Sequence, residues 1–394
     1  MADFADDSKH RCSHTLQGLR KMRQPKSIRL ICDLQFGSTG KGLIAGYLAE
    51  KYQPDTLVAA WSPNAGHTYI SSQHEKFIHT MLPNGIVSPA LKRVMLGPGS
   101  TINLDSLYQE VKAAAVYTMG TTIYIHGNAT IVQQKHRDEE AGPMTKIGST
   151  KKGCGAALIE KIRRDPDTKI TAKHWEPEIE AMFQGLYNRY NIDVQIVPTQ
   201  AGWLNVLALA HVMQIEGAQG YSLGMLSGFY PYTTSRECTP AQICIDCGVP
   251  AYWDMVRIGS ARTYPIRVAN RYDDQGNMVG WSGPCYAGQT ETTWDRLGVP
   301  VEITTVTKLP RRVFSFSRNQ IREAVEMTGV DEIFLNFVNY WDGVDFIKDN
   351  IYTTDAIKSC KEFGATLAYV GHGPAHKDVE QASRVPGSGG ENVY

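Results

Sequence analysis

Two short segments of the chain carry residue types suited to phosphoryl chemistry. Residues 37–42 read Gly-Ser-Thr-Gly-Lys-Gly directly after an apolar run, and residues 64–68 read Asn-Ala-Gly-His-Thr. The glycines let backbone amides approach an anion closely, and Lys41 adds a positive charge. The first segment is not a Walker A loop, because four residues do not separate a glycine from Gly-Lys and no Ser or Thr follows the lysine. Taken alone, such a turn can be only a turn, and His67 can be a loop histidine bonded to backbone.

The sequence around these segments predicts an α/β fold. Apolar runs alternate with amphipathic stretches, which is typical of a largely parallel central sheet with helices on both faces. We expect a helix over residues 43–51 and strands over residues 28–34, 56–60, 94–96, 122–126, 194–198, 212–215, 332–337 and 366–370. Nearly every strand runs into a Gly-, Asn- or Thr-rich loop. These loops are therefore expected to converge on one crevice beyond the carboxyl ends of the strands.

The composition is that of an ordinary globular protein, with 42% hydrophobic and 20% charged residues. Residues 26–384 are predicted to form a single domain between a flexible N-terminal tail, 1–25, and a loose C-terminal tail, 385–394. Lys plus Arg equals Asp plus Glu at 40 each. No overall positive field would therefore attract nucleic acid or a membrane surface. No apolar run approaches the roughly 20 residues that span a bilayer, so we expect a cytoplasmic protein.

The eight cysteines form no disulfide framework, which suits a reducing cytoplasm. Cys244 and Cys247 make a CxxC motif, with Cys238 nearby. Without a second pair this motif is a weak zinc signal. The alternative interpretation is that these are small buried side chains.

The two glycine- and histidine-containing segments resemble the phosphate loop and the catalytic histidine loop of adenylosuccinate synthetases. Further stretches match that family in order and spacing, at residues 76–87, 96–105, 147–155, 216–220, 230–235 and 305–312. The resemblance runs from about Ile28 to Val379. It implies the family's P-loop-like fold with loop insertions, a homodimer, and a Mg²⁺-dependent ligase. Such a ligase joins aspartate to a purine nucleotide through a 6-phosphoryl intermediate.

The resemblance also implies roles for individual residues. The catalytic set is Ser38, Lys41 and His67, with magnesium at Ser38 and the Gly66 carbonyl. The energy donor is assigned to Gly37, Ser38, Thr39, Gly40, Lys41, Gly42, Asn339, Gly371, Gly373 and Pro374. The acceptor nucleotide is assigned to Ser38, Asn64, Ser149, Thr150, Arg164, Gln219, Leu223 and Thr234. Arg164, or alternatively Arg163, would reach the nucleotide of the other subunit. Aspartate is assigned to Thr305, Thr307 and Arg311, because an arginine fork binds a carboxylate bidentately.

Three departures from the family pattern point to different substrates. Ser38 replaces the family's catalytic Asp, and its shorter neutral side chain leaves room for the 2-amino group of guanine. Leu309 replaces an arginine that contacts the ribose 2′-hydroxyl. This favours a deoxyribose, because a buried hydroxyl without a partner costs about 1–3 kcal/mol. Asn339 replaces the Asp that binds the guanine of GTP, and an Asn side chain can pair with adenine instead.

These departures resemble the bacteriophage branch of the family, the succino-2-amino-2′-deoxyadenylate synthases. That branch makes a precursor of the 2-aminoadenine in phage DNA. The predicted partners are therefore dGMP, L-aspartate and either ATP or dATP, between which the sequence does not decide. One alternative is an ordinary adenylosuccinate synthetase that uses IMP and GTP. Another is an inactive nucleotide-binding regulator, although the retained Lys41, His67 and Arg311 argue against it.

Losing the catalytic Asp leaves the ring proton of the purine without an obvious acceptor, since serine is a poor base at neutral pH. Asp33 stands where the family usually has Gly, five residues before Ser38. It is a candidate for the replacement base or for a partner of the 2-amino group. The alternative is a polar residue that simply ends a strand.

Overall fold

The computed structural model describes residues 24–141, 151–304, 308–341 and 347–382. A ten-stranded sheet runs through it in the order β19-β18-β17-β11-β1-β10-β2-β5-β7-β9. All its pairings are parallel except that of β18 with β19. Its strands are β1 Ser27–Asp33, β2 Thr56–Ala59, β5 Arg93–Leu96, β7 Thr122–His126, β9 Asp193–Val197, β10 Val212–Glu216, β11 Val256–Arg262, β17 Glu332–Asn336, β18 Thr366–Gly371 and β19 Val379–Gln381. The predicted α/β class with a largely parallel sheet is confirmed.

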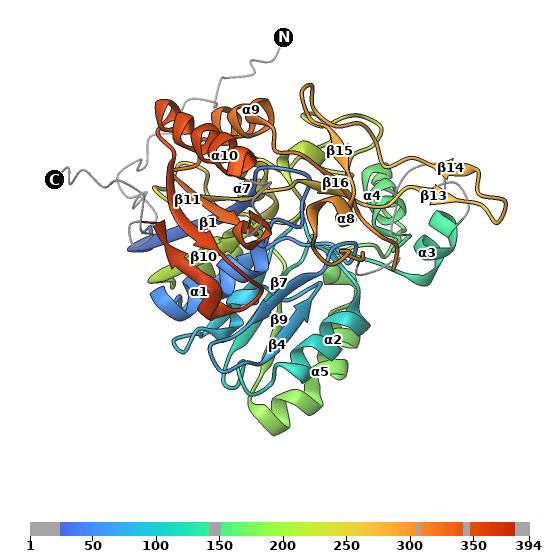
Figure 1. The fold of residues 1–394 in the computed structure, drawn as a ribbon. Helices are drawn as coiled ribbons and strands as arrows, with labels where there is room; N and C mark the ends of the chain where they lie inside the picture. Colours follow the sequence, from blue (N-terminus) through green and yellow to red (C-terminus); the bar gives the residue numbers. More distant parts are fainter. Residues whose placement is uncertain (1–23, 142–150, 305–307, 342–346, 383–394) are drawn as a thin grey trace, which may run out of the picture.

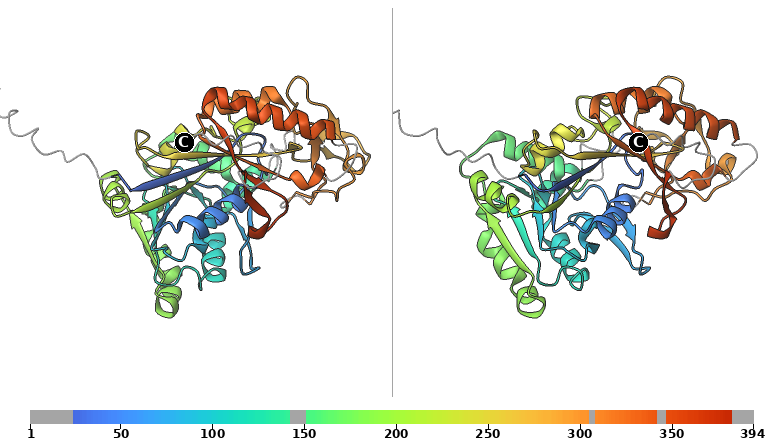
Figure 2. Two further views of the ribbon diagram at one scale, coloured as in Figure 1. Left: turned by 60° about the vertical axis from the view of Figure 1, so that its left-hand side comes forward. Right: turned by 90° about the vertical axis from the view of Figure 1, so that its left-hand side faces the viewer.

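Shorter strands and the helices surround this sheet. The short strands are β3 His67–Ile70, β4 Lys76–His79, β6 Thr101–Ile102, β8 Thr130–Ile131, β12 Ile266–Arg267, β13 Arg271–Tyr272, β14 Met278–Gly280, β15 Glu291–Thr292 and β16 Arg312–Phe314. The α-helices of the described ranges are α1 Lys41–Tyr52, α2 Leu104–Ala113, α3 Gln134–Ala141, α4 Cys154–Arg163, α5 Glu176–Tyr190, α6 Gln200–Leu207, α7 Pro240–Cys247, α8 Trp294–Leu297, α9 Arg318–Thr328 and α10 Ile347–Ser359. Figures 1 and 2 place α9 and α10 at one end of the molecule and α2 and α5 at the other.

Strand β1 lies at the centre of the sheet and is buried on both faces. Leu30 belongs to a hydrophobic cluster that includes side chains of α6, α7 and α9, whereas Ile31 packs into a second cluster with Leu43 and Leu48 of α1. This alternation follows from the opposite directions of successive side chains in a strand. It explains why β1 carries the consecutive apolar residues Leu30, Ile31 and Cys32 rather than a strict alternation.

Every strand and the helix expected from the sequence are present, with ends that differ by at most two residues. The sequence does not predict β11, because Val-Arg-Ile-Gly-Ser-Ala-Arg holds few large apolar side chains. In the structure, Leu34 packs closely over Gly259 of this strand, so a neighbour supplies the apolar volume. The predicted domain limits stay a prediction, and the proposed tails lie almost wholly outside the described residues.

The cysteines that raised the question of zinc are buried. Cys244 and Cys247 belong to the main hydrophobic cluster, and burial raises the pKa of Cys238 to about 12 and of Cys244 to about 11. Within the described ranges, no group of three or more His, Cys, Asp or Glu side chains could hold a metal ion. The CxxC pair therefore contributes apolar packing from α7. None of the helices in the described part of the chain has the length and apolar character to cross a membrane.

Candidate active site

The carboxyl ends of the central strands open onto one cavity of about 830 Å³. The phosphate loop follows β1, the segment with Asn64 follows β2, and Gln219 follows β10. The residues assigned from the sequence that line this cavity are Gly37, Ser38, Gly40, Lys41, Gly42, Asn64, Gly66, His67, Gln219, Leu223, Thr234, Arg311, Asn339, Gly373 and Pro374. The parallel sheet therefore brings together segments that are more than 300 residues apart in the chain, as expected for the edge where ligands bind.

The remaining assigned residues lie elsewhere. Thr39 belongs to the phosphate loop, but its side chain is buried. Gly371 ends β18, where an added Cβ atom would lie 2.2 Å from an Asn336 side-chain oxygen. Arg164 caps the carboxyl end of α4, is exposed, and does not line the cavity of its own chain. Arg163 is also exposed. The assignments to Ser149, Thr150, Thr305 and Thr307 fall outside the described residues.

The phosphate loop has the backbone of an anion site. Gly37, Ser38 and Gly40 have φ values of 82°, 55° and 99°, which place them in the left-handed region. Gly40 is the N-cap of α1, and no side chain caps that helix. The first amides of α1 therefore remain available to an anion, and the helix dipole favours negative charge there. An added Cβ atom on Gly40 would lie 2.1 Å from Asn336 Nδ2, so the loop also needs glycine for close packing.

The Asp33 carboxylate accepts hydrogen bonds from this loop and does not line the cavity. Its Oδ2 accepts from Thr39 Oγ1 at 2.5 Å and from Lys41 Nζ at 3.0 Å, and its Oδ1 accepts from the amides of Gln35 and Gly37. The carboxylate is 1% exposed. Four donors from residues 35–41 occupy both oxygens, which favours an anchoring role for Asp33. The sequence-based roles of Asp33, as a base or as a partner of the 2-amino group, stay predictions.

Lys41 and Gln219 join the phosphate loop to the acceptor side of the cavity. Lys41 Nζ donates to the Gln219 carbonyl at 2.6 Å, and Gln219 Nε2 donates to Asn64 Oδ1 at 3.1 Å. Leu223 lies against the phosphate loop, since an added Cβ atom on Gly37 would be 3.7 Å from its Cδ1. The charge of Lys41 is thereby held between the loop and the residues assigned to the nucleotide.

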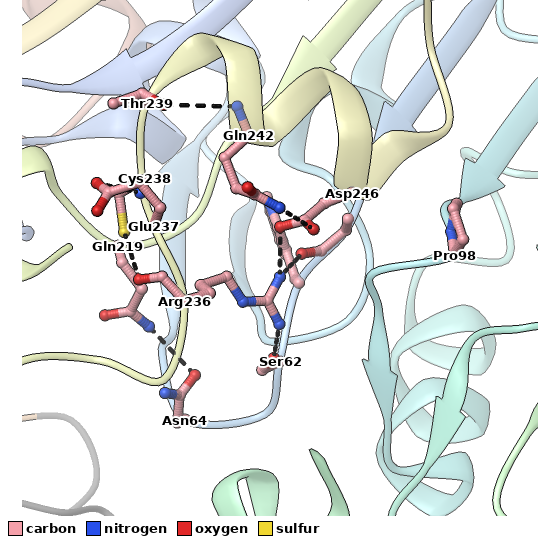
Figure 3. Close-up of polar contacts among 12 residues, drawn as sticks. Ser62, Asn64, Pro98, Gln219, Arg236, Glu237, Cys238, Thr239, Gln242 and Asp246 are labelled. Carbon is pink, nitrogen blue, oxygen red and sulfur yellow. Dashed lines mark hydrogen bonds and ion pairs between the residues drawn. The ribbon is translucent and has the colours of Figure 1, made fainter. Parts of the chain in front are cut away.

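Arg236 supports the segment that leads to Asn64, a role that the sequence did not suggest. Its Nη1 donates to the Ala60 carbonyl at 2.7 Å, and its Nη2 donates to Ser62 Oγ. Asp246 of α7 pairs with the same guanidinium at 3.4 Å. Figure 3 shows Arg236 directed toward Ser62, with Gln219 and Asn64 facing each other beside it. Only the tertiary structure brings α7 to this loop.

His67 is held as a neutral, partly enclosed imidazole. Its ring stacks on Trp61, with centroids 4.0 Å apart and 13° between the planes, and it is 7% exposed. Burial lowers the pKa of His67 well below its ordinary value, and the charges of Lys41 and His79 lower it further. Its Nε2 is buried and has no hydrogen-bond partner in the protein. A neutral imidazole at a cavity wall can donate one hydrogen bond to a substrate oxygen.

Residues 302–312, which we call the aspartate loop because the sequence assigns part of this segment to aspartate, contribute Glu302, Thr304, Leu309 and Arg311 to the cavity lining. The Arg311 amide donates to the Glu302 carbonyl at 2.8 Å, the Thr304 amide donates to the Leu309 carbonyl at 2.9 Å, and the Leu309 amide donates to Thr304 Oγ1 at 3.0 Å. Burial lowers the pKa of Arg311, although the negative charge of Glu302 opposes the shift. Leu309 is 38% exposed and lines the cavity, as its proposed contact with a deoxyribose requires.

The segment after β17 forms another wall of the cavity. Asn336 Nδ2 donates to the Thr39 carbonyl at 3.2 Å, and its Oδ1 accepts from the Phe337 amide, so this side chain is occupied in the fold. Asn339 lines the cavity with Phe337 and Tyr340. Of the two asparagines, Asn339 is therefore the one placed to meet a ligand.

Among the described residues, two carboxylates line the cavity, and both accept hydrogen bonds from the protein. Glu140 accepts from the amides of Gly153, Gly155 and Ala156 at 2.6–3.2 Å, which anchors the start of α4. Glu302 pairs with Arg262 at the end of β11. Sequence reasoning missed both glutamates, because neither lies in a recognisable motif. Only the tertiary structure shows which residues bond to these two glutamates.

Comparison with known proteins defines the class of this site. The model of the adenylosuccinate synthetase family matches residues 30–195 and 180–370, and the chain belongs to that family. The N6-succino-2-amino-2′-deoxyadenylate synthase of Acinetobacter phage SH-Ab 15497 is 51% identical over 368 residues, which cover 90% of this chain and 93% of the relative. The protein of the same name from Cyanophage S-2L is 45% identical over 358 residues, with coverage of 90% and 92%.

Solved structures agree with this relationship. The Cyanophage S-2L succinoaminodeoxyadenylate synthetase, bound to dGMP and to dATP as an energy donor, has a TM-score of 0.79 and 43% identity, with 91% of this chain and 96% of that chain covered. A fully ligated adenylosuccinate synthetase from Plasmodium falciparum has a TM-score of 0.64 and 18% identity, with coverage of 90% and 99%. The second likeness shows the shared fold. The first places the chain with the phage members of the family.

Proposed function

We propose that this protein is an ATP- or dATP-dependent ligase that joins L-aspartate to carbon 6 of dGMP, giving succino-2-amino-2′-deoxyadenylate for the synthesis of 2-aminoadenine DNA. The observation that carries the proposal is the exposed Ser38 side chain at the cavity, in the loop position where the family has its catalytic Asp. A short neutral residue there accommodates the 2-amino group that distinguishes guanine from hypoxanthine. The phage relatives that carry this activity in their names support the same substrate.

The reaction has two steps that balance without a redox partner. First, oxygen 6 of the purine takes the γ-phosphoryl group of the donor, the bond between that group and the leaving nucleoside diphosphate breaks, and the proton on nitrogen 1 is released to water. The aspartate amine then attacks carbon 6, so that a carbon–nitrogen bond forms while the phosphate leaves with oxygen 6 and takes up the proton that the amine loses. Lys41 lies where it can stabilise the charge that develops on the phosphoryl oxygens, and neutral His67 can donate to oxygen 6.

The other proposed contacts come from the resemblance to the family. Arg311 would hold an aspartate carboxylate, and Leu309 would face the deoxyribose. On the donor side, Asn339 would pair with adenine beside Gly373 and Pro374. Contacts to the nucleotide's 5′-phosphate would come from Ser149 and Thr150. We also propose a homodimer, in which the exposed Arg164 completes the site of the partner subunit, and activity in the host-cell cytoplasm.

The residues present fit a magnesium ion. Ser38 and the Gly66 carbonyl are oxygen donors at the same cavity as the phosphate loop. Mg²⁺ commonly takes few protein oxygens and completes its shell with phosphates and water, so a dedicated carboxylate cage is not required. When bound, the ion would supply neutralising charge to the transferring phosphoryl group. Lys41 and the amides of α1 orient the phosphates from the protein side.

The proposal is tested by aspartate-dependent phosphate release with ATP, comparing dGMP and IMP as acceptors under matched conditions. A strong preference for dGMP supports the proposed reaction. A preference for IMP returns the protein to ordinary purine synthesis. Omitting aspartate is the control, because release that does not need aspartate reports only nucleotide hydrolysis.

A further inference from the structure

Arg262 is a fully buried charged side chain close to the cavity. It ends β11, between β1 and β17. Gln35 fixes its backbone from both sides: the Arg262 amide donates to Gln35 Oε1 at 2.9 Å, and Gln35 Nε2 donates to the Arg262 carbonyl at 3.2 Å. The starting point of the side chain is therefore tied to the loop that follows β1.

The guanidinium of Arg262 contacts three walls of the active site. Its Nη1 donates to the Ser38 carbonyl at 3.1 Å and to Glu302 Oε2 at 3.1 Å, and its Nη2 donates to Glu302 Oε1. The same group lies 3.8 Å from the centre of the Phe337 ring. One side chain thus holds the phosphate loop, the start of the aspartate loop and the segment after β17.

Glu302 connects Arg262 to Arg311 and Tyr340. Its carbonyl accepts from the Arg311 amide, and its carboxylate accepts from Tyr340 Oη at 2.9 Å. Burial is the largest single effect and would raise the pKa of Glu302, but the charge and hydrogen bonds of Arg262, the hydrogen bond from Tyr340 and the charge of Arg311 together lower it. The carboxylate therefore stays charged. A shift of either partner would move Arg311 on one side and Tyr340 on the other.

An ion pair at this depth is not explained by stability alone. Buried ion pairs are often no more stabilising than apolar residues of the same volume, because both charges lose their hydration. Arg262 Nε even lacks a hydrogen-bond partner. The bidentate fork fixes direction as well as distance, which a lysine or an apolar side chain would not do.

We propose that Arg262 is a positioning residue that couples the energy-donor site to the aspartate site. It does not line the cavity, so it acts through Ser38, Glu302 and Phe337. When a nucleotide orders the phosphate loop and the wall at Phe337, Arg262 holds Glu302 and thereby places Arg311 for the aspartate carboxylate. The inference rests on the proposed function, since it assigns the cavity walls to donor and aspartate.

The test is the KM for aspartate at limiting and at saturating ATP, with dGMP saturating throughout. In the wild-type protein, saturating ATP should lower this KM by about fivefold or more, within the usual range of coupling between sites. Arg262→Met should bring the ratio of the two KM values close to one and lower kcat by about tenfold or more, because Ser38 and Arg311 are no longer held in register. Arg262→Lys keeps the charge without the fork and should recover part of the ratio.

Two further variants separate coupling from simple loss of stability. Glu302→Gln breaks the same fork from the other side, so it should reduce the ratio as Arg262→Met does, and the double variant should lose little more. Arg257→Met is the matched control, since Arg257 lies at the opposite end of β11, pairs with Asp331 at 3.8 Å, and does not line the cavity. It should leave the ratio unchanged.

The proposal is overturned if Arg262→Met keeps the wild-type ratio, even with a lower melting temperature, or if the wild-type ratio is itself one. If Arg262→Met does not fold, Arg262→Lys and Glu302→Gln decide by the same criterion. Failure of the proposed function has a different signature, because the wild-type protein would then not turn over dGMP. The ratio would in that case be measured with IMP and GTP.

Discussion

Asp33 at the end of β1 and Ser38 in the phosphate loop have different surroundings. The resemblance to the family predicts a carboxylate at position 38. Here the carboxylate is at Asp33, where it is buried and bonded to Thr39 and Lys41, and the cavity receives the hydroxyl of Ser38 instead. A buried carboxylate is stable when it is paired and fully hydrogen-bonded. The loop thus keeps a charged anchor, and in the proposed function the neutral Ser38 leaves space for the acceptor base.

Replacing Ser38 should change substrate preference. Ser38→Asp places a longer, charged side chain where the 2-amino group would lie, so kcat/KM for dGMP should fall by about tenfold or more relative to dIMP. The measurement is the ratio of kcat/KM for the two acceptors. Ser38→Ala is the control, because it keeps the space and should retain the preference for dGMP. Equal losses on both acceptors after Ser38→Asp would contradict the steric role of Ser38.

His67 should make stability depend on pH in a defined direction. Its pKa is lowered from 6.5 in the folded state, so below that pH the unfolded chain takes up a proton that the folded protein does not. Stability present above 6.5 is therefore lost as the pH falls toward the folded pKa, by at most about 1.4 kcal/mol per pH unit for this one group. His67→Asn should show a shallower loss.

The measurement is the free energy of unfolding by urea at about pH 5.5 and about pH 7.5, compared between wild type and variant. His74→Asn is the control: His74 lies in the turn between β3 and β4, is exposed, and has a φ of 66°, which Asn tolerates. An unchanged pH dependence in His67→Asn would show that this imidazole does not titrate as proposed.

At the scale of elements, α1 and the loop before it act as one unit. Asn336 at the end of β17 bonds to the Thr39 carbonyl, and Ser260 of β11 donates to the same oxygen at 3.2 Å. Two neighbouring strands thus fix the turn from which the free amides of α1 emerge. The geometry of the anion site therefore depends on sheet assembly as much as on the glycines.

Gly40 should tolerate no side chain. Gly40→Ala combines a φ of 99° with a Cβ atom 2.1 Å from Asn336 Nδ2, so it should cost about 1–3 kcal/mol of stability and abolish ATP turnover. Thermal unfolding and phosphate release measure the two effects. Gly120→Ala is the matched control, since Gly120 has a φ of 73° with nothing within 4 Å of an added Cβ atom. It should lose a smaller amount of stability and keep full activity. Normal turnover in Gly40→Ala would contradict the proposed role of the loop.

At the scale of the whole molecule, the cavity is a product of the parallel sheet. The neighbours of β1 are β10 and β11, which lie about 180 and 230 residues further along the chain. All three end at the same edge, so their loops meet. The exposed Arg164, in contrast, lies outside the cavity of its own chain, and its proposed role depends on a second copy.

Mixed dimers test that role. Lys41→Ala and Arg164→Ala should each be inactive alone, because each removes charge from the same kind of site. A hybrid dimer contains one intact site, so an equal mixture after subunit exchange should recover about a quarter of wild-type activity. Arg163→Ala mixed in the same way shows which arginine crosses the interface. Without any recovery from either mixture, the proposed contribution of the partner subunit would be wrong.

Local sequence determined the strands, the phosphate loop and the family. The mostly apolar residues 28–34 predict a strand, which the structure forms at Ser27–Asp33, and the glycines at 37 and 40 mark a turn that needs their backbone freedom. Such features depend on neighbours in the chain, so patterns and motifs reveal them. The resemblance that these motifs carry identified fifteen residues that line one cavity in the structure.

The tertiary structure decided which polar groups meet. Asp33 pairs with Lys41, Arg262 pairs with Glu302, and β11 is a strand although its own sequence is only weakly apolar. The two ion pairs join residues 8 and 40 positions apart, and β11 pairs with β1 about 230 residues away. A buried charge must find its partner wherever the fold places one. Neither the choice of partner nor the pairing of distant strands follows from the apolar pattern of one segment.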